Sequence, residues 1–140
     1  MFEKILLGVD GSSHALRAAK TAGDLARCMK AKILRIVVAF ESVPPYLGEP
    51  NLQAVISNRL VQAEEILEAA VKAVGEIPGD VHTEVLEGSA AEAILDVAKT
   101  RNSDIIVMGS RGLGRLTGLL IGSQSQKVVQ HAPCPVLIVR

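Results

Sequence analysis

A glycine-rich stretch in the last quarter of the chain has the composition of a phosphate-binding loop. It reads GSRGLGRLTGLLIGS, spans residues 109–123 and contains five glycines. Without side chains in the way, backbone N–H groups can approach anionic oxygens, and the N-terminus of a following helix adds favourable partial charge. Ser123 and Ser125 could add hydroxyl donors, and Arg111 and Arg115 could meet phosphate charge. The residues predict a phosphate-bearing ligand, with tight turns as the alternative use of the glycines.

A second polar segment, Asp10-Gly11-Ser12, follows the first apolar run of the chain. Open parallel sheets bind ligands beyond the carboxyl ends of their strands, where the strand order reverses. If the first and fourth strands are neighbours, this segment and the glycine-rich stretch meet across one crevice. Asp10 is then a ligand-binding residue, and the alternative is that it closes a turn or caps a helix.

Two common phosphate motifs fit the glycine-rich stretch less well. A Walker loop requires a Gly-Lys pair, which the sequence lacks. Gly112-Leu113-Gly114 is similar to the start of a dinucleotide fingerprint, but Gly118 comes one position too late and the run follows the fourth strand instead of the first. The sequence therefore predicts neither a Walker loop nor a dinucleotide fingerprint.

The histidines and cysteines lack the spacing of a metal or catalytic site. His14, His82 and His131 fall on a helix start, an alternating strand and a helix end, so we expect them at the surface. Cys28 lies in a helical pattern and Cys134 lies between two prolines, and both are expected to be reduced thiols. We therefore predict no metal ligands from the protein side chains.

The elements that must position these segments alternate between strands and helices. Apolar runs and one alternating segment predict strands at residues 4–10, 31–40, 81–86, 104–109 and 135–139. Apolar steps of three and four residues predict helices between them, one with a stripe from Leu52 to Val74 and one capped by Ser89. The resulting βαβαβαβαβ order predicts an α/β, Rossmann-like fold: an open, doubly wound, five-stranded parallel sheet of order 3-2-1-4-5, with helices on both faces.

The composition limits the classes of protein and partner. A chain of 140 residues is expected to form a single domain, residues 1–140. Lysine plus arginine and aspartate plus glutamate each number 15, so no excess positive charge favours nucleic acid. The sequence has neither a signal-peptide pattern nor an apolar run of membrane-spanning length, which predicts a cytoplasmic protein that does not bind membranes.

Three stretches resemble the universal stress protein family, in the branch that binds ATP. They are the signature Gly109-x-x-Gly112, nine residues, Gly122-Ser123, together with the opening at residues 5–12 and the ending at residues 131–139. The resemblance implies a nucleotide site made by Asp10, Val38, Met108, Gly109, Arg111, Gly112, Gly122, Ser123, Gln124 and Ser125.

The resemblance also implies a function and partners. ATP, or alternatively AMP or ADP, would bind with Mg²⁺ held mainly through the phosphates, and its occupancy would regulate unidentified protein partners during stress. Aromatic residues make up only 2% of the chain, so aliphatic packing and backbone hydrogen bonds would recognise the adenine. A slow ATPase and a dimeric scaffold without turnover are the alternatives. The apolar strand at residues 135–139, expected at a sheet edge, implies a homodimer.

Overall fold

The computed structural model describes residues 1–41, 48, 51–110 and 123–140. The Pro-rich loop expected at residues 42–50 therefore lies outside the described residues except for Gly48, and so does the larger part of the glycine-rich stretch.

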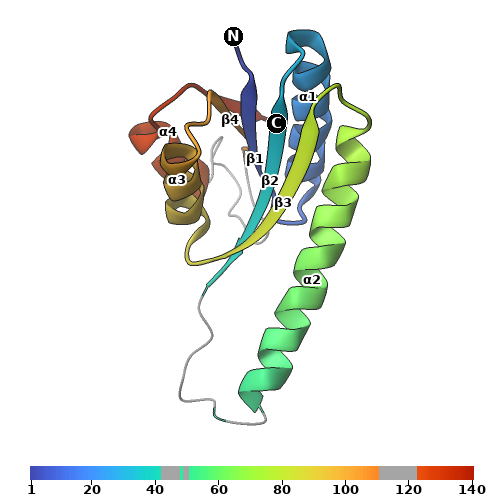
Figure 1. The fold of residues 1–140 in the computed structure, drawn as a ribbon. Coiled ribbons are helices and arrows are strands. Elements are labelled where there is room, and N and C mark those ends of the chain that lie inside the picture. Colours follow the sequence, from blue (N-terminus) through green and yellow to red (C-terminus); the bar gives the residue numbers. More distant parts are fainter. Residues whose placement is uncertain (42–47, 49–50, 111–122) are drawn as a thin grey trace.

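Within the described residues, five strands and four helices alternate, as expected from the sequence (Figure 1). The elements are β1 (Lys4–Gly8), α1 (Ser13–Met29), β2 (Ile33–Phe40), α2 (Asn51–Val74), β3 (Asp80–Glu87), α3 (Ala90–Thr100), β4 (Ile105–Gly109), α4 (Ser123–His131) and β5 (Val136–Val139). The predicted strand at residues 4–10 ends two residues early, because the chain turns after β1.

The strands form one parallel sheet in the order β3-β2-β1-β4-β5, which confirms the predicted topology. β1 lies at the centre, where Gly8 is in register with Val37 of β2 and with Met108 of β4. The carboxyl ends of these three strands therefore lie side by side. The runs in β1 and β4 are apolar throughout because both faces of the central strands are covered.

Helices cover both faces of the sheet. α1 and α2 pack on one face, where they share a core with Ile5, Leu7 and Val107, and α3 and α4 pack on the other, around Leu6 and Ile106 (Figure 1). The helix after β1 and the helix after β4 consequently leave the sheet on opposite faces. Such a divergence between neighbouring strands opens the sheet edge where α/β proteins bind ligands.

α2 departs from the expected pattern of burial. The sequence predicts one apolar stripe from Leu52 to Val74, but only the C-terminal half of that stripe is buried, and Leu60 is 50% exposed. A helix of 24 residues is about 36 Å long, whereas strands of eight residues such as β2 and β3 are about 26 Å long. The N-terminal part of α2 therefore projects past the sheet (Figure 1).

Candidate functional site

The turn after β1 brings Asp10 to the carboxyl edge of the sheet. One carboxylate oxygen, Oδ1, accepts a hydrogen bond from the backbone N–H of Ser12 at 3.0 Å, and this bond closes the turn. The Ser12 hydroxyl in turn accepts from the N–H of Ala15 at 3.1 Å and caps α1. Asp10 thus has the turn-closing role that the sequence left as an alternative. Its carboxylate remains at the edge where a ligand would bind, and it is partly exposed.

β4 ends on a glycine that allows close contact with α1. A Cβ atom at Gly109 would lie 2.9 Å from the backbone carbonyl carbon and from the Cβ of His14. Any side chain there would force α1 away from the sheet, since real Cβ atoms do not approach other atoms so closely. The first glycine of the signature therefore serves packing in this fold, in addition to any role in ligand binding.

Ser110 links three elements at the start of the glycine-rich stretch. Its N–H donates to the carbonyl of Val139 at the end of β5, at 2.8 Å. Its hydroxyl lies 3.2 Å from Nδ1 of His14, in the first turn of α1. We expected His14 at the surface, but it is partly buried and joins the site. One sequence feature could have pointed to Ser110: it is a polar residue directly after a buried strand.

The N-terminus of α4 lies beside the end of β4. The Ser125 hydroxyl is buried and donates to the carbonyl of Gly109 at 2.8 Å, so it anchors the start of α4 to β4. Ser123 is the exposed first residue of α4, at the helix end that attracts anions. Gln124 points elsewhere: its Oε1 accepts from the N–H of Ala91 at 2.9 Å and ties α4 to α3. These contacts fix α4 at the same edge as Asp10.

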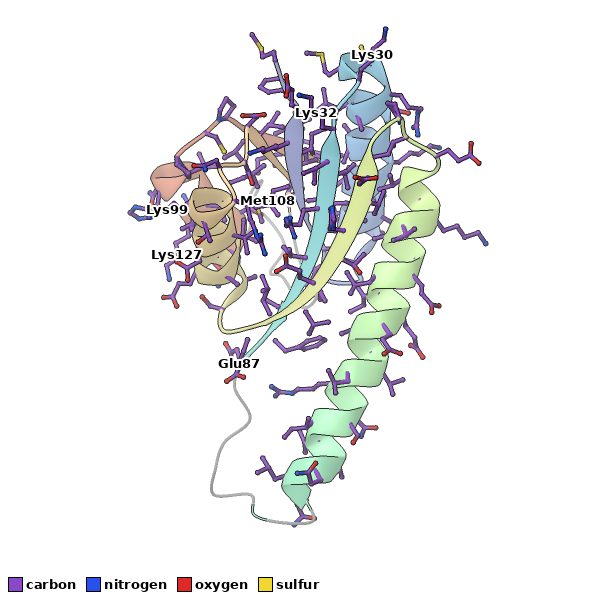
Figure 2. All side chains as sticks on the ribbon, viewed as in Figure 1. Lys30, Lys32, Glu87, Lys99, Met108 and Lys127 are labelled. Carbon is purple, nitrogen blue, oxygen red and sulfur yellow. The ribbon has the colours of Figure 1, made fainter. Side chains whose placement is uncertain are left out.

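Val38 and Met108, both expected in the nucleotide site, have side chains on opposite faces of the sheet. Val38 belongs to the core beneath α1 and α2 and is 2% exposed. Met108 belongs to the core beneath α3 and α4, and Figure 2 shows it in the middle of the molecule. The structure therefore does not bring the two side chains together. Arg111, Gly112 and Gly122 lie outside the described residues.

The two cysteines lie apart from the carboxyl edge of the sheet, one in α1 and one before β5. Cys28 and Cys134 carry free thiols, and burial, assisted by the negative charge of Asp104, raises the pKa of the Cys134 thiol above its ordinary value. A raised pKa disfavours the reactive thiolate. Within the described ranges, side chains of His, Cys, Asp and Glu do not gather in threes to hold a metal ion. No described helix is long and apolar enough to span a membrane.

Comparison with known proteins identifies relatives over the full length of the chain. The model of the "Universal stress protein family" matches residues 1–140. A universal stress protein of Thermus aquaticus is 49% identical over 140 residues, and the match covers 100% of both chains. The structure of UspA from Lactobacillus plantarum is 27% identical and superposes with a TM-score of 0.87, covering 99% of this chain and 98% of that one.

A further solved structure in the comparison contains a nucleotide. It is a universal stress protein in complex with cAMP, 26% identical, with a TM-score of 0.71 and coverage of 97% of this chain and 95% of that one. These three comparisons agree with the family resemblance that the signature in residues 109–123 indicated. This chain belongs to the universal stress protein family.

Proposed function

We propose that this protein binds an adenine nucleotide at the carboxyl edge of its sheet, and that occupancy of the site regulates protein partners. The observation that carries the proposal is the divergence at β1 and β4. Gly8 and Met108 are in register, yet the chain continues from β1 to α1 on one face and from β4 to α4 on the other. This is the position at which doubly wound sheets bind nucleotides.

The described residues at this edge suit a phosphorylated ligand. The N-terminus of α4, which begins at Ser123, attracts negative charge, and the Ser125 bond to Gly109 holds that helix end in place. Arg111, Gly112 and Gly122 belong to the proposed site on the strength of the sequence signature. The cAMP complex of a relative that shares the fold supports a nucleotide as the ligand.

Asp10 is the proposed contact on the β1 side. A carboxylate offers about four acceptor positions, so the single bond from Ser12 leaves capacity for a ribose hydroxyl or for water on a Mg²⁺ ion. The site thus fits ATP with Mg²⁺ held mainly through the phosphates. Val38 and Gln124 are buried or turned toward other elements, so we assign them to the support of the site, together with Met108.

We extend the proposal to the domain organisation, oligomeric state and location of the protein. We propose that residues 1–140 fold as a single domain and that two copies pair through β5, which lies at the edge of the sheet. A cytoplasmic location, where thiols stay reduced, is supported by the free cysteines Cys28 and Cys134. Nucleotide occupancy would act by favouring one arrangement of the dimer or one partner.

Calorimetric titration with ATP and Mg²⁺ tests the proposal, followed by chromatography of the nucleotide after prolonged incubation. We expect saturable binding of one nucleotide per chain and ATP recovered intact. Asp10→Ala is expected to weaken binding about tenfold, which corresponds to ~1.4 kcal/mol. Asp96→Ala, on the exposed side of α3, is the matched control and should bind as the wild type does.

Other outcomes of the same experiment would replace the proposal. Steady formation of ADP that Asp10→Ala abolishes would make the protein a slow ATPase instead of a switch. Failure of the folded wild-type protein to bind ATP, ADP or AMP would leave a dimeric scaffold and overturn the nucleotide site.

A further inference from the structure

We propose that the amino edge of the sheet carries a second binding site, for a small phosphate-like anion. A cavity of about 290 Å³ lies there, between the starts of β1 and β2 and the turn after α3. Three of its lining residues, Lys4, Arg35 and Arg101, are cations, and three more, Thr100, Asn102 and Ser103, bear side chains able to donate hydrogen bonds. The cavity is small, so the proposed ligand is small as well.

Three cations line the cavity, and its described lining contains no carboxylate. Nη1 of Arg35 contacts Oε1 of Glu84, and Nη2 of Arg101 lies 3.9 Å from the same oxygen atom. A single carboxylate thus serves two guanidinium groups, with Lys4 as a third cation on the lining. An anion in the cavity would interact favourably with these three cations.

Arg35 is held in place before any ligand binds. Its side chain is 13% exposed, and it extends from β2 between Leu6 of β1 and His82 of β3, with which it is in register. Burying a guanidinium is costly unless charges and hydrogen bonds compensate. Its five N–H donors exceed what one carboxylate oxygen can accept, and the planar group suits a tetrahedral oxyanion.

Two carboxylates next to the cavity, those of Asp104 and Glu3, already have partners in the protein. Asp104 accepts hydrogen bonds from the backbone N–H groups of Glu3 and Lys4, at 3.0 and 2.9 Å. Glu3 pairs with Nζ of Lys32 at 3.0 Å, and Figure 2 shows Lys32 at this end of the molecule. The C-terminus of α3 adds a partial negative charge, which Arg101 at its C-cap offsets.

The second site is separate from the proposed nucleotide site. Lys4 opens β1 at the amino edge, and Gly8 closes it at the carboxyl edge, on the order of 13 Å away at about 3.3 Å per residue. A change at Arg101 therefore leaves the contacts at Asp10 and Ser125 intact. Binding at the amino edge can therefore be disrupted while the proposed nucleotide site at the carboxyl edge stays intact.

Titration of ¹⁵N-labelled protein with inorganic phosphate at constant ionic strength tests the inference by NMR. We expect saturable shifts of the backbone amides at residues 100–103 and at Lys4 and Ile5. Arg101→Gln should raise the apparent Kd for phosphate at least tenfold. Its side chain is 56% exposed, so the variant is expected to fold, and ATP titration of the same sample checks the nucleotide site.

Lys72→Gln provides the matched control, because it removes an exposed cation from the last turn of α2, which packs on the opposite face of the sheet from α3. This variant should bind phosphate as the wild type does. Three results would overturn the second site: shifts at the amino edge that do not saturate, saturable shifts confined to residues 109–125, or an Arg101→Gln variant that binds with unchanged affinity. In that case the cations at the amino edge would serve folding alone.

Discussion

The side chains at the carboxyl edge are held in place by hydrogen bonds within the fold. Asp10 closes its own turn, and Ser125 donates a hydrogen bond to the carbonyl of Gly109. Both side chains are therefore ordered without a ligand. His14 and Ser110 add a contact between α1 and the start of the glycine-rich stretch. Groups held in advance lose less conformational freedom on binding, which favours affinity.

Cys134 offers a prediction of pH dependence. Burial and the charge of Asp104 raise the pKa of its thiol, so a smaller fraction is thiolate at any pH below that pKa. We expect iodoacetamide to alkylate Cys134 more slowly than the cysteine of an uncharged, unstructured model peptide at pH 8, and the rate to reach its half-maximum at a higher pH. The rate would be followed by mass spectrometry in a Cys28→Ser variant. Alkylation as fast as that of the model thiol would contradict the raised pKa.

At the scale of elements, polar contacts at the N-termini of α1, α3 and α4 help to position these helices. Ser12 caps α1, and Ser89 caps α3 by accepting a hydrogen bond from the N–H of Glu92 at 3.4 Å. Gln124 then connects the starts of α4 and α3 through Ala91. Because the N-terminus of α4 is the proposed phosphate contact, this connection makes α3 part of the support of the site.

The cap of α1 can be tested with two neighbouring serines. Ser12→Ala removes the acceptor for the Ala15 N–H in a buried position, so we expect a loss of about 1 kcal/mol in the free energy of unfolding. Ser13→Ala changes an exposed residue one position later and should alter stability by less than about 0.5 kcal/mol. Urea denaturation followed by circular dichroism measures both. Equal effects of the two substitutions would show that the cap contributes nothing specific.

At the scale of the whole molecule, the sheet has two edges of different character. β3, at one edge, is exposed at five of its eight residues, and its partly buried residues Val81 and Leu86 pack on opposite faces of the sheet. β5 is partly buried along its whole length, and its side chains contribute to the cores on both faces of the sheet. An apolar edge strand with unpaired backbone groups favours pairing with a second strand. β5 is therefore the proposed dimer interface.

Charged substitutions on the two edges test that interface. Val136→Asp should convert the protein to a monomer in sedimentation velocity, because pairing of the two β5 strands would bring the carboxylates of both copies close together on one face of the joined sheet. Val85→Asp places the same charge on β3, at a side chain that is 42% exposed, and should leave the dimer intact. Thermal unfolding of both variants shows whether the fold survives. A folded Val136→Asp variant that remains dimeric would reject β5 as the interface.

Much of the fold could be predicted because its determinants are local. The strands were predicted from short apolar runs, and the helices from apolar spacing and the Ser89 cap. The alternation of strands and helices then predicted a parallel sheet. The glycine signature between β4 and α4 indicated the family, which the full-length match confirms. These features need no knowledge of distant contacts, since propensity and periodicity act within one element.

Tertiary packing alone decided which way several of these residues face. Because the central strands are apolar on both faces, their sequence contains no alternation to show that Val38 and Met108 point to opposite sides. The contact of Gln124 with Ala91 and that of His14 with Ser110 join residues 33 and 96 positions apart, and local pattern does not encode them. The sequence by itself determined the elements, their order and the family; the tertiary structure decided which side chains meet, because that depends on strand register and helix packing over long separations.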